Sequence, residues 1–188
     1  NQEVYRFQGI SAARISRDQG WHFLQLGRYI ERASETADVL NVDFRELYSS
    51  ALAADAVDQQ TYLDWVGLLR GTAAYEAYSR MYTANVQPRY IIEFLLLNSE
   101  FPYSVHFAIN AIQFALEAIG GATETPKTAR VYRLAGRLRA MLDYAQVDEI
   151  MESGLGTYLL DIQSRCAEIH DAIYQTYITY SVEEKLAR

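Results

Sequence analysis

Apolar side chains recur every three or four residues along almost the whole chain, which is the spacing of one face of an α-helix. The pattern is clearest near the C-terminus, where apolar and aromatic residues share one face: Leu155, Leu159, Ile162, Cys166, Ile169, Ile173, Tyr177 and Tyr180. We expect the last helix to cover about 147–180 or 156–180. Alternation with a period of two, typical of half-buried strands, is nearly absent. The sequence therefore predicts an all-α fold, a bundle of about six to seven helices, mostly antiparallel and joined by short connections.

Breaks in the apolar pattern divide the rest of the chain into helices. A first long helix is predicted over about 18–42 and a shorter one over about 44–52. A third pattern covers about 59–82. Within it, Gly71 is a weak point that costs roughly 1 kcal/mol relative to alanine and favours a kink.

The three prolines of the chain each precede an apolar run with helical spacing: Pro88 before 91–97, Pro102 before 105–119, and Pro126 before 131–142. Proline fits the first turn of a helix because its missing N–H has no partner there. We therefore expect helices to begin at or soon after these positions. Thr125 is a predicted N-cap, and Gly120 with Gly121 is a predicted stop for the preceding helix.

The composition is that of one folded domain. The chain has 188 residues, of which 50% are apolar or aromatic and 22% are charged, so it is long enough to bury a sizeable core. We interpret residues 1–188 as a single helical domain. The net charge of −7, from 17 Lys and Arg against 24 Asp and Glu, disfavours binding to a phosphate backbone as the main activity. Nucleic acid is not an expected partner.

A single cysteine, Cys166, excludes an internal disulfide and a multi-cysteine zinc site, which fits a reducing compartment. We therefore expect a cytoplasmic protein. Because Cys166 lies on the apolar face of the last helix, we interpret it as a buried apolar residue and not as a nucleophile. The longest uninterrupted apolar run, Phe94 to Leu97, is far short of the roughly 18 residues that span a bilayer, so we expect no membrane segment.

The first predicted helix has a second face on which charged and large apolar side chains mix: Trp21, Arg28, Arg32, Glu35 and Val39. This mixture indicates a helix with neighbours on two sides. Arg28 and Arg32 are like charges one turn apart, which is unfavourable unless nearby glutamates or an outside anion neutralise them. The pattern alone favours a solvated face with pairs such as Arg28 to Glu31. An anion site on the two guanidinium groups and a buried structural ion pair are the alternatives.

Two other predicted helices carry polar strips. Arg130, Arg133 and Arg137 form a basic strip in an acidic protein, which could meet an anionic ligand or an acidic partner. The second strip includes a histidine that could act as acid or base, and it consists of His106, Asn110, Gln113 and Glu117. For both strips the pattern favours a solvated helix face.

Standard motifs for a metal or a cofactor are missing from the sequence. The three histidines, His22, His106 and His170, lie far apart, and none belongs to a His-Glu-x-x-His or Glu-x-x-His element. Glycine-rich phosphate loops of the Walker or Rossmann kind are also missing. We therefore expect neither a metal ion nor a bound cofactor.

The run SRDQGWHFLQLGRYIERA at residues 16–33 resembles the hallmark segment of the bacterial alpha-E family, which is named for a helical domain with a Glu-Arg motif. Blocks at residues 65–82, 86–101 and 133–138 are similar to later blocks of that family, in the same order. Family members are longer and carry a similar Glu-Arg helix near their N-terminus. The resemblance thus implies that this chain is the C-terminal portion of a longer protein, with an exposed half-core that could drive self-association.

Genes of the alpha-E family lie beside, or are fused to, those of circularly permuted ATP-grasp ligases, and near those of transglutaminase-like and amidohydrolase-like proteins. The resemblance therefore implies a role in ATP-dependent peptide or amide-bond synthesis. Our main hypothesis is a non-catalytic helical partner that binds the ATP-grasp ligase, another protein of the pathway, or the peptide product.

The alternative is an enzyme of peptide modification in which Glu31 is the general acid or base while Arg28 and Arg32 bind an anionic group. Arg133 and Arg137 are the candidates for further ligand contacts. A third hypothesis is a structural bundle whose Glu-Arg motif only fixes the register of its helix. The resemblance assigns no reaction to the domain, so Glu31 and Arg32 are hallmark residues and not known catalysts.

Overall fold

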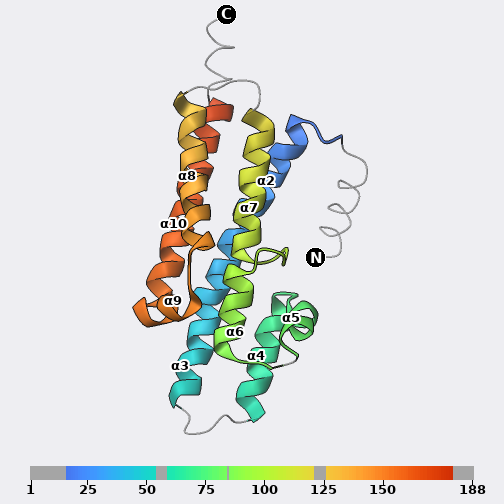
Figure 1. Cartoon of the computed structure of the whole chain (residues 1–188), viewed down its shortest axis with the longest axis vertical. Helices are drawn as coiled ribbons and strands as arrows, with labels where there is room; N and C mark the ends of the chain where they lie inside the picture. The colour runs from blue at the N-terminus through green and yellow to red at the C-terminus, as the bar shows by residue number, and fades with distance from the viewer. Residues whose placement is uncertain (1–15, 54–58, 84, 121–125, 180–188) are drawn as a thin grey trace, which may run out of the picture.

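The computed structural model describes residues 16–53, 59–83, 85–120 and 126–179, and these residues form helices without any strand (Figure 1). The all-α prediction is confirmed. The described residues contain eight helices when each π-helical turn is counted with the helix that it extends. This number exceeds the predicted six to seven because two of the predicted helices are each divided into two, while two others are joined into one. No helix in the described part is both long and apolar enough to cross a bilayer.

Four long helices form the body of the molecule: α2 (Gln19–Val39), α7 (Val105–Gly120), α8 (Pro126–Asp143) and α10 (Leu155–Ile173). Helix α2 packs most extensively on α7 and also on α10, while α8 packs on both α7 and α10. The colours in Figure 1 show that the chain reverses direction from α2 to α7, from α7 to α8, and from α8 to α10. The body is therefore an antiparallel four-helix bundle.

The first helix is longer than predicted. Helix α2 passes into a π-helical turn, η1 (Leu40–Phe44), which leads directly into α3 (Arg45–Ala53). The prediction of two separate helices was wrong for this region, because no glycine or proline interrupts the stretch and stops the helix. Leu40 and Phe44 are both fully buried, which anchors the π turn to the core.

The third apolar pattern is divided into α4 (Gln59–Gly71) and α5 (Tyr75–Tyr82), so the weak point predicted at Gly71 is confirmed. The chain turns at Ala73, whose φ of 55° lies in the left-handed region. Helix α4 packs on α3 and α5. These elements extend the bundle at the end opposite the described start of α2 (Figure 1).

Two of the three prolines begin a helix as predicted. Pro88 is the first residue of α6 (Pro88–Ile92), which continues as the π turn η2 (Glu93–Leu97), and Pro126 is the first residue of α8. At these positions the ring fixes φ for the helix and the missing N–H leaves no bond unmade. Thr125, the predicted cap of α8, lies outside the described residues.

The third proline, Pro102, lies in the turn before α7 and outside the helix itself. The Ser104 hydroxyl accepts a hydrogen bond from the Phe107 N–H at 3.0 Å and so caps the start of α7. The helix ends at Gly120, as predicted, whereas Gly121 lies outside the described residues.

The last apolar pattern forms α9 (Val147–Ser153) and α10, and a π turn, η3 (Tyr174–Thr179), continues α10. Gly154 separates α9 from α10 with a φ of 114°, in the region that favours glycine. The predicted apolar face is buried along α10, at Leu155, Leu159, Ile162, Cys166, Ile169 and Ile173. Tyr177 is partly buried, and Tyr180 lies outside the described residues.

Cys166 is fully buried within this face, as the apolar pattern predicted. Burial raises the pKa of its thiol to about 11, and a smaller effect of a hydrogen bond with Ser34 acts in the opposite direction. The thiol is therefore protonated at neutral pH, which agrees with its interpretation as a packing residue and not a nucleophile.

Candidate functional site

Arg32 of the Glu-Arg motif points into the interface between α2 and the turn before α7. Its side chain is buried, with 8% of the residue exposed, and its Nη1 donates a hydrogen bond to the carbonyl oxygen of Pro102 at 3.1 Å. The guanidinium carbon lies 4.1 Å from the centroid of the Tyr103 ring and 5.5 Å from that of Tyr29. Burial, and then the charge of Arg28, lower the pKa of Arg32, although an arginine stays protonated in proteins.

A second side chain of α2 holds the same turn. The Thr36 hydroxyl, one helical turn beyond Arg32, donates to the carbonyl oxygen of Tyr103 at 3.0 Å. The turn is also closed internally, because the Asn98 side-chain oxygen accepts hydrogen bonds from the N–H groups of Glu100 and Phe101 at 2.8 and 2.7 Å. Two consecutive carbonyl groups of a rigid turn are thus bound to α2.

Glu31 faces different surroundings from its neighbour Arg32, because adjacent residues of a helix are rotated by roughly 100°. Glu31 is exposed, whereas Arg28 is partly buried with its guanidinium carbon 5.7 Å from the centroid of the Tyr29 ring. The solvated-face interpretation is therefore right for Glu31 and wrong for Arg32. The mixed face of this helix predicts neighbours on two sides, and α2 does pack on both α7 and α10.

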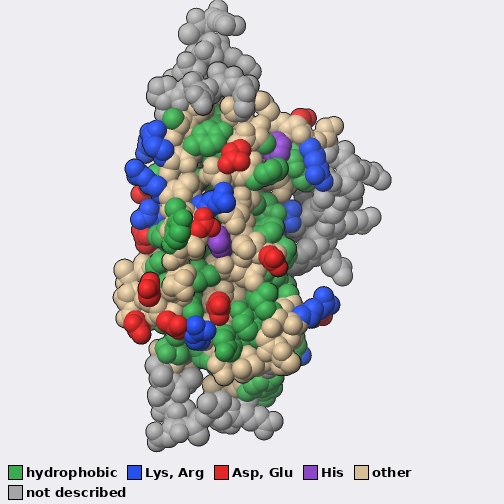
Figure 2. Space-filling model, in the orientation of Figure 1, with side chains coloured by type: hydrophobic (Ala, Val, Ile, Leu, Met, Phe, Trp, Pro, Cys, Tyr) green, Lys and Arg blue, Asp and Glu red, His purple; other side chains and the backbone are tan. Residues whose placement is uncertain are grey.

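Arg133 and Arg137, the other predicted ligand-binding residues, are exposed on α8. Helix α8 packs mainly on α7 and α10, so these two arginines belong to a different surface from that of Arg28 and Arg32. Figure 2 shows Lys and Arg side chains gathered along the edge of the molecule where Figure 1 places α8 and α10. Residues 126–143 contain five basic residues and one acidic residue in a chain with a net charge of −7. The prediction that the basic strip lies on a solvated helix face is confirmed.

The predicted polar strip on α7 is only partly solvated. His106 is buried, with Nδ1 2.9 Å from the carbonyl oxygen of Leu97 and Nε2 2.8 Å from Oδ1 of Asp143. The solvated interpretation was therefore wrong for His106, and it holds only at Glu117, the exposed end of the strip. The signal in the sequence was that apolar residues precede and follow this histidine on the helix. Its ring joins the C-terminal ends of η2 and α8.

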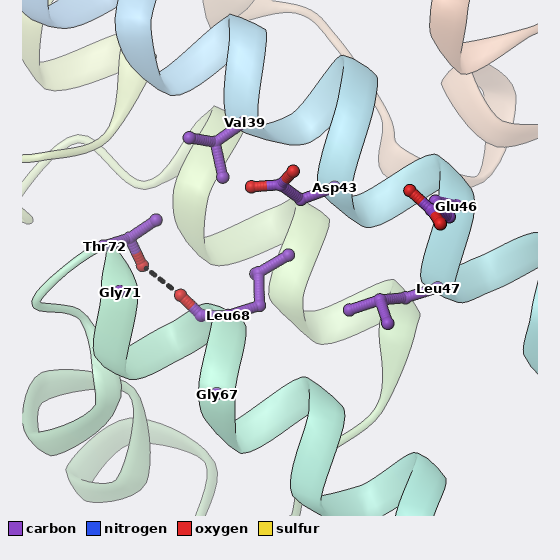
Figure 3. A pocket seen from close by; sticks show the side chains of 8 residues that line it. All are labelled: Val39, Asp43, Glu46, Leu47, Gly67, Leu68, Gly71 and Thr72. Carbon is purple, nitrogen blue, oxygen red and sulfur yellow. Dashed lines mark hydrogen bonds between the residues drawn. The ribbon is translucent and has the colours of Figure 1, made fainter.

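The structure contains a cleft that the sequence did not predict. The cleft has a volume of about 510 Å³, and its residues come from the end of α2, from η1, from α3, from α4 and from the residue after α4: Val39, Asp43, Glu46, Leu47, Gly67, Leu68, Gly71 and Thr72. We call it the α3/α4 cleft (Figure 3). It lies away from the Glu-Arg motif, and its two walls come from segments that are separated in sequence.

A second, apolar groove of about 340 Å³ lies between α2 and the C-terminal end of α10, with Phe23, Leu26, Gly27, Ile30, His170, Ile173, Tyr174, Tyr177 and Ile178 along its walls. Neither Glu31 nor Arg32 lines this groove or the α3/α4 cleft. Within the described ranges, no group of three or more His, Cys, Asp or Glu side chains could hold a metal ion.

Comparison with known families gives one match. The sequence model of the Alpha-E family, described as a predicted alpha-helical domain with a conserved ER motif, matches residues 1–178. Glu31-Arg32 is the only Glu-Arg dipeptide in the sequence, so these two residues correspond to the motif. No curated protein and no solved structure matches the chain.

Proposed function

The chain belongs to the Alpha-E family, and on this basis we propose that it is a non-catalytic helical partner of an ATP-grasp ligase that makes peptide or amide bonds. In this proposal the exposed arginines of α8 dock on an acidic surface of the ligase, and the Glu-Arg motif maintains the fold of the partner. The observation that carries the proposal is the engagement of Arg32 with the protein itself.

The position of Arg32 supports a structural role for the motif. An arginine that binds a substrate anion must present its N–H groups to the ligand. Arg32 instead donates to the Pro102 carbonyl oxygen and lies over the Tyr103 ring, and only 8% of the residue is exposed. A substrate would have to displace these contacts and pay for leaving the Pro102 carbonyl group without its partner.

The exposed side chains of α8 support a docking role. Arg130, Arg133 and Arg137 are all exposed, and none forms an ion pair with an acidic residue within the described part of the chain. Basic groups on one helix of an acidic protein give a local field that accelerates encounter with an acidic surface and orients the two proteins. A ligase with such a surface would meet α8 in a defined orientation.

The surroundings of Glu31 give little support to the alternative, an enzyme with Glu31 as acid or base. Glu31 is exposed, and neither of the described cavities has it in a wall. A general acid or base works best in a site that excludes water and holds the substrate within hydrogen-bonding reach. We expect the Glu31→Gln variant to retain full activity in the pathway, and a large loss of activity with unchanged ligase binding would favour the enzyme.

The docking proposal can be tested by measuring binding of the purified chain to the cognate ATP-grasp ligase. We expect the double variant Arg133→Glu, Arg137→Glu to bind at least about tenfold more weakly at low salt, since it reverses the charge of the docking surface. The control is Arg17→Glu, Arg80→Glu, which makes the same change of net charge at exposed positions outside α8.

Two results would contradict the proposal. The first is that the wild-type chain does not bind the ligase, and the second is that both double variants bind the ligase equally weakly. In the second case net charge, and not the α8 surface, controls the encounter. Binding of the peptide product without binding of the ligase would replace the proposed partner by the product.

A further inference from the structure

The α3/α4 cleft has the size and the wall composition of a ligand site. Its volume of about 510 Å³ falls in the range of small-molecule pockets, roughly 300–1,000 Å³. Val39, Leu47 and Leu68 contribute apolar walls from α2, α3 and α4. One wall includes η1, a π-helical turn, and turns of this kind recur at functional sites.

Two glycines keep the cleft open on the α4 side. Gly67 and Gly71 are one helical turn apart, and a Cβ atom added at either position would meet no atom within 4 Å. Neither residue has a positive φ, so the backbone conformation does not require glycine at these places. A glycine inside a helix makes the helix less stable than an alanine at the same position would. We therefore interpret Gly67 as a residue that leaves free space in the cleft.

The charge of the cleft is negative and uncompensated. Asp43 and Glu46 lie on the wall formed by η1 and α3, across from Leu68 on α4 (Figure 3). Both carboxylates are exposed, and no Lys, Arg or His of the described residues pairs with either. The one polar side chain of the opposite wall, Thr72, donates its hydroxyl proton to the carbonyl oxygens of Leu68 and Leu69 at 3.0 and 3.1 Å. The cleft therefore presents acceptors for positive charge and apolar surface for a hydrocarbon stem.

We propose that the α3/α4 cleft binds the side chain of a lysine presented by a peptide. The four methylene groups lie along Val39, Leu47 and Leu68, while the ammonium group binds the carboxylates of Asp43 and Glu46. A long aliphatic stem with one terminal charge matches the combination of apolar walls and two exposed carboxylates on one side of the cleft. The proposal concerns a surface separate from α8, and it does not depend on docking to a ligase.

The probe is the peptide acetyl-Gly-Lys-Gly-amide, titrated at low salt into the full chain labelled with ¹⁵N. The control peptide carries norleucine, which has nearly the same stem and no charge. We expect amide shifts confined mainly to residues 39–47 and 67–72 with the lysine peptide, and much weaker binding of the norleucine peptide.

Two variants locate the binding. Asp43→Asn, Glu46→Gln removes both charges with little change of shape, and we expect it to bind the lysine peptide at least about fivefold more weakly. The matched control, Glu149→Gln, Glu152→Gln, removes two exposed charges from α9 and should bind like the wild type. Gly67→Leu places a side chain in the free space and should abolish binding, and an unchanged midpoint of thermal unfolding would show that the fold is intact.

The proposal is overturned if the lysine peptide causes no shifts up to about 10 mM, or if the norleucine peptide binds equally well. Equal weakening in both pairs of charge variants would also overturn it, since the effect would then come from net charge alone. Shifts spread over distant helices would indicate non-specific association and lead to the same conclusion.

Discussion

Arg32 and Tyr103 form a cation–π contact in which the guanidinium carbon lies 4.1 Å from the centroid of the ring. The same guanidinium donates a hydrogen bond to the carbonyl oxygen of Pro102, the residue before Tyr103. Helices α2 and α7 form the most extensive helix contact of the described residues, and these interactions fix the turn that leads into α7 against α2. The arginine of the Glu-Arg motif thus links the motif helix to the start of α7.

Replacing Arg32 by leucine should destabilise the fold. The change removes a charge-assisted hydrogen bond and a cation–π contact, and it leaves the Pro102 carbonyl oxygen without its donor. We expect the free energy of unfolding to fall by about 2–4 kcal/mol. Arg32→Lys keeps the charge but loses the planar group that lies over Tyr103, so it should cost about 1–2 kcal/mol. Urea unfolding followed by circular dichroism measures both values.

The matched control for this prediction is the neighbouring residue, Glu31. Its side chain is exposed, so Glu31→Gln should change the free energy of unfolding by no more than about 0.5 kcal/mol. Equal costs at Glu31 and Arg32 would contradict the different roles that we assign to the two residues of the motif.

Thr36→Val tests the second contact between α2 and the same turn. Valine has nearly the same shape as threonine but cannot donate to the Tyr103 carbonyl oxygen, and we expect a loss of about 1–2 kcal/mol. Arg32 and Thr36 bind consecutive carbonyl groups, so their effects should not add in a double-mutant cycle. Simple additivity would show that the turn does not act as one rigid unit.

The helices could be predicted well because their signals are local. Apolar spacing located α7, α8 and α10, and the spacing selected every buried side chain of α10 except Ala172. The continuity of α2 with α3 was missed because a π turn keeps the chain helical while it shifts the apolar spacing, and the sequence pattern resembles a break. The division of the last predicted helix into α9 and α10 was harder to predict, because it depends on the backbone angle φ of one residue, Gly154.

The candidate sites were harder to predict because they depend on packing between distant segments. The spacing placed Arg32 on a mixed face, but only the turn at Pro102 decides that its guanidinium is buried. The α3/α4 cleft needs residues of η1 and α3 to lie beside residues of α4, which no periodicity within one helix can indicate. His106 was assigned to solvent because its helix spacing was polar, whereas the ends of η2 and α8 cover it.

Cys166 should make stability depend on pH in alkaline solution. Burial raises the pKa of its thiol to about 11 in the folded chain, above the ordinary value of about 8.5 in an unfolded chain. Between these values the unfolded state releases a proton that the folded state keeps, so stability is complete below about pH 8 and falls as the pH rises toward 11. We expect this residue to contribute a loss of up to about 1.4 kcal/mol per pH unit in that window.

The measurement compares the wild type with Cys166→Ala across the alkaline range, because tyrosines also ionise there. The two proteins differ at every pH through packing, so only the change of their difference with pH reports the thiol. A constant difference from pH 8 to 11 would show that the thiol ionises equally easily in the folded state. A thiol reagent should likewise react slowly with the folded wild type and rapidly after unfolding.

Gly67→Ala should stabilise the protein while it begins to fill the α3/α4 cleft. Gly67 lies inside α4, its added Cβ would meet no atom within 4 Å, and alanine is the better helix former. We expect the free energy of unfolding to rise by about 0.5–1 kcal/mol in urea titrations.

Gly136→Ala is the matched comparison, because Gly136 is a glycine of α8 with equal free space that lies outside the cleft. Both changes should raise stability, but only the change at Gly67 should weaken binding of the lysine peptide. If Gly67→Ala stabilises the protein without weakening binding, the lysine peptide does not occupy the part of the cleft beside Gly67. A loss of stability would show that the space beside Gly67 is already occupied.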